Sequence, residues 1–140
     1  GGTPLHYAVS NEKGVELIKY LVSLGADIHA VNKDGDTLLH QAAGRSRKVE
    51  VLKHLVSSGL DVHAKNNDGK RPIHYAAQNP NLEIITYLVS IGADIHVKTE
   101  KSDRYILVEG QTPLHFAAQN KNLEVTKYLV SLGADVQAKE

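Results

Sequence analysis

Apolar side chains recur along the chain with the spacing of helices that bury one side. The clearest stripe lies in a helix predicted over about residues 82–91 and consists of Ile84, Ile85, Leu88 and Val89. Gly92 follows the stripe directly, and glycine is the preferred residue where a helix ends in the left-handed conformation. A shorter helix is predicted over about residues 72–79, since proline at a first helical position costs no hydrogen bond.

A four-residue phrase of the type Thr-Pro-Leu-His occurs four times. It begins at residues 3, 37, 71 and 112, so that successive copies start 34, 34 and 41 residues apart. A second phrase of the type Gly-Ala-Asp-Ile follows each copy and begins at residues 25, 59, 92 and 133. A period of this length is typical of a solenoid, in which each unit has an apolar face that only a neighbouring unit can cover.

These phrases resemble those of the ankyrin repeat family, and the resemblance covers nearly the whole chain. Further matches are the alanine pairs after the histidine and the Asp-Gly pairs before the phrase, namely Ala42-Ala43, Ala76-Ala77, Ala117-Ala118, Asp34-Gly35 and Asp68-Gly69. The resemblance implies an all-α repeat solenoid of stacked helix-turn-helix units with β-hairpin loops. It also implies a concave face that binds a partner protein.

We expect a single ankyrin-repeat domain over residues 1–140, with repeats at about 1–33, 34–67, 68–108 and 109–140. The first and last units keep the apolar pattern of internal units, whereas the end of a solenoid usually has a polar capping unit. The sequence therefore predicts a segment of a longer array, monomeric but with uncapped ends that are able to self-associate.

One loop is longer than its counterparts, because eight extra residues lie within about residues 99–108. Residues 95–99 and 104–108 are rich in β-branched and apolar side chains and flank a charged tip, which favours a two-stranded ribbon. The outward-facing apolar residues of this ribbon are either covered by the next unit or exposed as a contact patch. The sequence leaves both alternatives open.

Composition excludes several functions. The chain has 140 residues, 41% of them hydrophobic, and a formal net charge of zero, whereas binding to nucleic acid or an anionic membrane normally requires a basic excess. No apolar run approaches the roughly 20 residues that cross a bilayer. Cysteine is absent, so that thiol chemistry is excluded, and this composition suits a reducing cytoplasm.

Seven of the eight histidines fall into two repeating series. His6, His40, His74 and His115 end the first phrase, and His29, His63 and His96 follow the aspartate of the second phrase by two residues. Residues that recur in each unit are best explained by folding and stacking. For the second series, where the family usually has asparagine, we hypothesise that imidazoles bridge adjacent loops and make the stack sensitive to pH near 6.

Neither catalysis nor a cofactor is predicted. The sequence has no GxGxxG, Walker, GxSxG or HExxH motif. Successive histidines of a series lie one repeat apart, too far to share a metal ion with bonds near 2.1 Å.

Binding residues are expected where the copies differ, at loop tips, before the first phrase and at the end of the short helix. The predicted partner-binding residues are Lys33, Asp34, Asp36, Arg45, Lys65, Asn67, Asp68, Lys70, Gln78, Asn79, Arg104, Tyr105, Leu107, Gln111, Gln119 and Asn120. Their mixed charges favour a non-catalytic protein-protein interaction module. The alternative is a structural spacer, favoured by the near-identical segments 19–23 and 127–131.

Overall fold

The computed structural model describes residues 3–100 and 109–139. In these ranges the chain forms four pairs of antiparallel helices. The helices are α1 (Pro4–Ala8), α2 (Gly14–Ser23), α3 (Leu38–Arg45), α4 (Val49–Ser57), α5 (Pro72–Ala76), α6 (Leu82–Ser90), α7 (Pro113–Gln119) and α8 (Leu123–Ser131). None of the described residues belongs to a β-strand.

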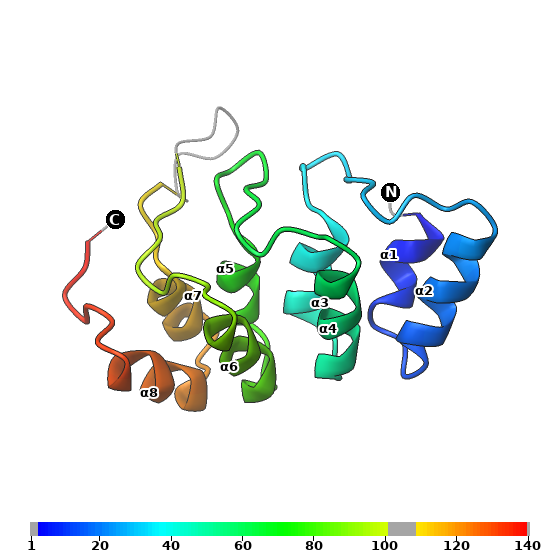
Figure 1. Ribbon diagram of the computed structural model, residues 1–140. Helices are drawn as coiled ribbons and strands as arrows, with labels where there is room; N and C mark the ends of the chain where they lie inside the picture. Colours follow the sequence, from blue (N-terminus) through cyan, green and yellow to red (C-terminus); the bar gives the residue numbers. More distant parts are fainter. Residues whose placement is uncertain (1–2, 101–108, 140) are drawn as a thin grey trace.

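The helices stack in two rows, which Figure 1 shows side by side. The inner row consists of α1, α3, α5 and α7, and the outer row of α2, α4, α6 and α8. Long loops join each unit to the next and project from the same edge of the stack. They are loop 1 (24–37), loop 2 (58–71) and loop 3, of which residues 91–100 and 109–112 are described. The all-α repeat solenoid predicted from the sequence is therefore confirmed.

The core runs along the stack instead of forming a central globule. Three of the four residues of the predicted stripe of α6, Ile84, Ile85 and Leu88, are fully buried, and Val89 is half-buried. Ala42, Ala43, Ala76 and Ala77 are also fully buried, and their small side chains let neighbouring inner helices approach closely. Burial between units is the main source of stability, because each unit is too small to bury its own apolar face.

Short turns between the two helices of a unit are tied to the preceding unit by asparagine side chains. The Asn79 amide donates to the carbonyls of Ala43 (3.0 Å) and Ser46 (2.9 Å). One unit later, the Asn122 amide donates to the Asn79 carbonyl (2.8 Å). These bonds satisfy carbonyl groups that the ends of the inner helices leave without partners.

Two local predictions need correction. The inner helix of the third unit ends at Ala76, three residues earlier than expected. The strand predicted over residues 95–99 does not form, because Ile95 and His96 lie in a turn. The Asp94 carboxylate fixes this turn by accepting the backbone N–H of His96 at 2.8 Å, a local side-chain bond that competes with strand pairing.

The base of loop 3 keeps the geometry of the shorter loops. In loop 2 the Asn66 side chain accepts the backbone N–H groups of Asp68 and Lys70, both at 2.9 Å. In loop 3 the hydroxyl of Thr99 accepts the N–H of Gln111 at 3.0 Å, and the Thr99 N–H donates to the Gln111 carbonyl at 2.9 Å. The eight extra residues are thus inserted beyond a closed base, and the predicted second strand of the ribbon lies outside the described residues.

Candidate functional site

Each inner helix begins with the same bond from the backbone to a histidine. The N–H of the residue before the helix donates to Nδ1 of the histidine three residues later, at 2.9, 3.1, 2.9 and 2.9 Å in the four units. Three units add a threonine hydroxyl at the same nitrogen. The third unit has Arg71 instead and keeps the backbone bond alone, so the helix start does not require the hydroxyl.

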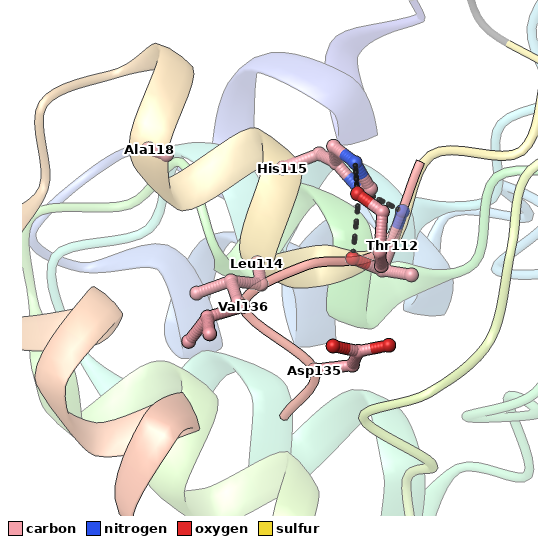
Figure 2. Close-up of a pocket in the computed structure, with 7 residues that line it drawn as sticks. Thr112, Leu114, His115, Ala118, Asp135 and Val136 are labelled. Carbon is pink, nitrogen blue, oxygen red and sulfur yellow. Dashed lines mark hydrogen bonds between the residues drawn. The ribbon is translucent and has the colours of Figure 1, made fainter. Parts of the chain in front are cut away.

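In the second, third and fourth units the other ring nitrogen joins the unit to the loop that follows, whereas Nε2 of His6 is buried without a hydrogen-bond partner among the described residues. Nε2 lies 2.9 Å from the Lys70 carbonyl for His40, 3.1 Å from the Val97 carbonyl for His74, and 3.1 Å from the Ala138 carbonyl for His115. Because Nδ1 accepts a bond from the backbone, the ring proton belongs on Nε2, which donates it to the carbonyl. Figure 2 shows His115 beside Thr112, whose backbone N–H and hydroxyl bond to Nδ1 of the ring.

Burial keeps the imidazoles of His40 and His74 neutral. Loss of solvent lowers the pKa of His74 to about 4, although bonds to the carbonyls of Val97 and Gln111 partly oppose the shift. Burial lowers the pKa of His40 in the same way. A neutral ring is what the geometry requires, since a proton on Nδ1 would point at another N–H. The structural role predicted for this first histidine series is therefore confirmed.

The second histidine series does not bridge the loops. The rings of His29, His63 and His96 are exposed, and none forms a hydrogen bond with the described part of the chain. Only their backbone N–H groups are engaged, each with the aspartate two residues earlier. The bridging that we hypothesised for these rings is therefore wrong, because the aspartate turns hold the rings in solvent.

Hydrogen bonds of the main chain and an ion pair join the described parts of the loop tips. The backbone N–H of Asn67 donates to the Asp34 carbonyl at 3.0 Å, and that of Glu100 donates to the Asp68 carbonyl at 3.2 Å. The Asn67 amide also donates to the Lys33 carbonyl at 3.1 Å. Between the next two tips, Lys65 pairs with Glu100. The three tips thus form one connected rim.

A polar cluster lies where loops 1 and 2 meet the inner row. The Asp36 carboxylate is 7% exposed and accepts the Tyr75 hydroxyl at 2.9 Å and the Asn66 amide at 2.8 Å. Burial, reinforced by the Asp36 charge, raises the pKa of Tyr75. The Lys70 ammonium lies over the rings of Tyr75 and Phe116, 5.7 and 5.4 Å from their centres. The faces of aromatic rings attract a cation in this position.

The predicted partner-binding residues separate into four groups by position. Exposed are Lys33, Arg45, Lys65, Asn67, Gln119 and Asn120. Half-buried are Asp34, Asp68, Lys70 and Gln78. Buried are Asp36, Asn79 and Gln111. Arg104, Tyr105 and Leu107 lie outside the described residues. The side chains of the first two groups lie at the surface, whereas the buried three hold the loops and turns in place.

One repeat position that contributes to the polar cluster was not among the predicted partner-binding residues. The residue after the phrase histidine is Tyr7, Gln41, Tyr75 or Phe116, and Tyr75 and Phe116 build the cluster under Lys70. The signal was present, because three copies have an aromatic residue at this position and the second copy has Gln41. It was overlooked because the residue adjoins the most uniform phrase of the repeat.

The described residues offer no arrangement suited to metal chemistry or to membrane insertion. In ranges 3–100 and 109–139, no group of three or more histidine or carboxylate side chains could hold a metal ion. Nor is any helix in this part of the chain both long and apolar enough to cross a membrane.

Comparison with protein families accounts for the repeated unit. A model of the ankyrin repeat in three copies matches residues 5–99 and, in a second match, residues 50–140. The chain therefore belongs to the ankyrin repeat family. Members of this family are generally protein-protein interaction modules and are typically not catalytic. A comparison with curated proteins found no match.

Proposed function

We propose that the chain is a non-catalytic module that binds another protein through its loop face, defined as the tips of loops 1–3 together with the inner helices beside them. The cluster around Tyr75 carries this proposal. Its charged members, Asp36 and Lys70, occupy the same repeat position, at which the units differ, so their identity is not explained by a feature that every unit shares. Hydrogen bonds from Asn66 and Tyr75 to Asp36 hold the cluster in place. The side chains of Lys70 and Tyr75 remain half-exposed there.

The chemistry of the loop face suits a polar protein surface. Exposed Lys33 and half-exposed Lys70 lie near the carboxylates of Asp34 and Asp68, whose charges reach Tyr75. A face with both charges and amides forms hydrogen bonds with a partner's backbone and side chains. Rigid tyrosine is also enriched among the residues that dominate binding energy. Hydrogen bonds already join the described parts of the loop tips, so binding does not have to order those residues first.

The experiment compares one loop-face variant with one outer-row variant. Lys70→Ala removes the half-exposed cation of the cluster, and the matched control Lys127→Ala removes an exposed cation from α8. Proteins captured from a lysate by the wild-type chain are identified, and the affinity of each for both variants is measured. We expect at least about a tenfold loss for Lys70→Ala, equivalent to about 1.4 kcal/mol, and no change for Lys127→Ala.

A structural spacer is the alternative function, and the repeated outer surface favours it. The segments 19–23 and 127–131 have the same sequence, and a repetitive surface carries little specificity. A spacer has no partner of its own, so any protein captured from the lysate would not recognise the cluster around Tyr75. Every captured protein would then bind both variants equally. That outcome would contradict the proposed function.

A further inference from the structure

Two buried polar atoms lie on neighbouring inner helices at the contact between the first and second units. They are Nε2 of His6, on α1, and Oε1 of Gln41, on α3, and neither has a hydrogen-bond partner among the described residues. Nearly all buried polar atoms of native proteins are hydrogen-bonded, because a polar atom removed from water without a partner is costly. The surroundings of these two atoms therefore indicate what each of them binds.

The two atoms have opposite roles in hydrogen bonding. The backbone N–H of Thr3 donates to Nδ1 of His6 at 2.9 Å, so the ring proton belongs on Nε2, which is a donor. Burial lowers the pKa of His6, which favours this neutral form of the ring. The amide oxygen of Gln41 is an acceptor. The contact between the two units thus buries one donor and one acceptor.

The next contacts along the stack show that these two positions face each other. Gln41 directly follows the phrase histidine of its unit, as Tyr75 does one unit later. The Tyr75 ring meets the His40 ring edge-on, with 5.7 Å between ring centres. The contact after that repeats the arrangement with a phenylalanine at 5.4 Å. By the same register, the side chain of Gln41 lies against the ring of His6.

The loop carbonyl that pairs with a later histidine does not pair with His6. Nε2 of His40 lies 2.9 Å from the Lys70 carbonyl, which also accepts a backbone N–H at 2.9 Å. The corresponding carbonyl of loop 1 is that of Asp36. Within the described part of the chain it accepts the N–H of Asn32, at 3.0 Å, and no bond from His6. Since a carbonyl oxygen has two lone pairs, this one keeps a lone pair for another donor.

We propose that a single buried water molecule occupies this contact, accepting a hydrogen bond from Nε2 of His6 and donating one to Oε1 of Gln41. Its second hydrogen donates to the carbonyl of Asp36. Three bonds are the number that a buried water typically forms. Water fits because it accepts and donates at once, whereas a cation would meet the Nε2 proton and an anion would meet the Gln41 oxygen. Solvent thus closes the contact that His40 closes directly one unit later.

Two measurements locate this water, and one variant displaces it. A crystal structure of the wild-type chain, at a resolution that orders water, gives the distances. NMR on protein with ¹⁵N-labelled histidine detects cross-relaxation between the Nε2 proton of His6 and water, as distinct from chemical exchange. Gln41→Phe removes the acceptor and gives the second unit the ring that Phe116 gives the fourth. The matched control Gln119→Phe makes the same change at an exposed glutamine of α7. Circular dichroism checks that both variants are folded.

We expect an ordered water within about 3.2 Å of both Nε2 of His6 and Oε1 of Gln41. The cross-relaxation should be present in the wild-type chain and in Gln119→Phe and lost in Gln41→Phe. A crystal in which the two atoms bond directly to each other, or in which no water lies within this distance of both, would overturn the proposal. So would cross-relaxation that persists in Gln41→Phe. The wild-type crystal decides the question even where a variant fails to fold.

Discussion

Two neighbouring donors depend on the carboxylate of Asp36. The Tyr75 hydroxyl and the Asn66 amide both donate to the same Asp36 oxygen, at 2.9 and 2.8 Å. The three side chains come from three segments, namely the end of loop 1, the tip of loop 2 and α5. A single buried acceptor therefore links two units, and its energetic value exceeds that of a surface hydrogen bond.

Replacing Asp36 with alanine removes the acceptor of the Tyr75 hydroxyl and one of the two acceptors of the Asn66 amide, which also donates to the Tyr75 hydroxyl at 3.1 Å. We expect Asp36→Ala to lower the free energy of unfolding by about 2–3 kcal/mol, since each unsatisfied buried donor costs about 1–3 kcal/mol. Tyr75→Phe removes one of these donors, so the double variant should lose less than the sum of the two single variants. Urea denaturation of the four proteins measures this coupling, and strict additivity would show that Asp36 and Tyr75 act independently.

Variation between copies identified interesting positions without showing where their side chains lie. Asp36, Asn79 and Gln111 vary and are buried, whereas Lys33 and Lys65 vary and are exposed. At a single position the repeat sequence does not reveal whether a polar side chain is buried or exposed, because such a side chain can form hydrogen bonds with either solvent or a neighbouring loop. Where Asn66 or the next turn lies in the folded chain decides which of the two it meets.

Close approach between loop tips imposes its own requirement on the main chain. Gly69 has a φ of +70°, in the left-handed region, and a Cβ at this position would lie 2.5 Å from the backbone nitrogen of Glu100. That nitrogen donates to the carbonyl of Asp68, one residue before the glycine. The bond between the second and third loop tips therefore depends on the absence of a side chain at residue 69.

Alanine at residue 69 is compared with alanine at residue 92, where the glycine also has a left-handed φ but open surroundings. Gly92 also has a left-handed φ, of +99°, but nothing lies within 4 Å of the position of its Cβ. Gly92→Ala should therefore cost the conformational penalty alone, about 1–2 kcal/mol. Gly69→Ala should cost more, because the loop tip has to separate from Glu100. Thermal unfolding compares the two variants, and equal losses would show that the tip contact contributes nothing.

The helices could be predicted closely and the loops could not. Helical spacing, prolines at the first positions and glycines at the ends are local signals, and they located α6 within one residue at its C-terminal end. Strand propensity over residues 95–99 was misleading, because the Asp94 carboxylate bonds locally to His96. The long-range bonds that shape loop 3, such as that between Thr99 and Gln111, join segments separated by the insertion and leave no periodic trace.

The whole molecule is held together by contacts between neighbouring units, so a change that weakens each contact affects the entire stack. The histidines of the first series contribute such a contact at successive units. His40 faces the Tyr75 ring and the charge of Asp36, and His74 faces the Phe116 ring and the charge of Arg71. Each requires a neutral ring to donate to the next loop.

This requirement predicts that acid destabilises the stack through the first series. The pKa of His74 is lowered from 6.5 to about 4 in the folded chain, so below pH 6.5 the unfolded state binds a proton that the folded state does not. The stability contributed by a neutral His74 is complete above pH 6.5 and is lost as the pH falls toward 4. We expect a loss of about 1–2 kcal/mol from this residue by about pH 5, before most carboxylates titrate. Urea denaturation between pH 7.5 and 5 measures the loss.

A triple variant with His29→Asn, His63→Asn and His96→Asn should keep the full dependence on pH, because those rings are exposed. His74→Gln should be less stable at pH 7.5 but show a shallower dependence. If the triple variant instead abolished the effect, the exposed series would be the sensor and the buried rings would not.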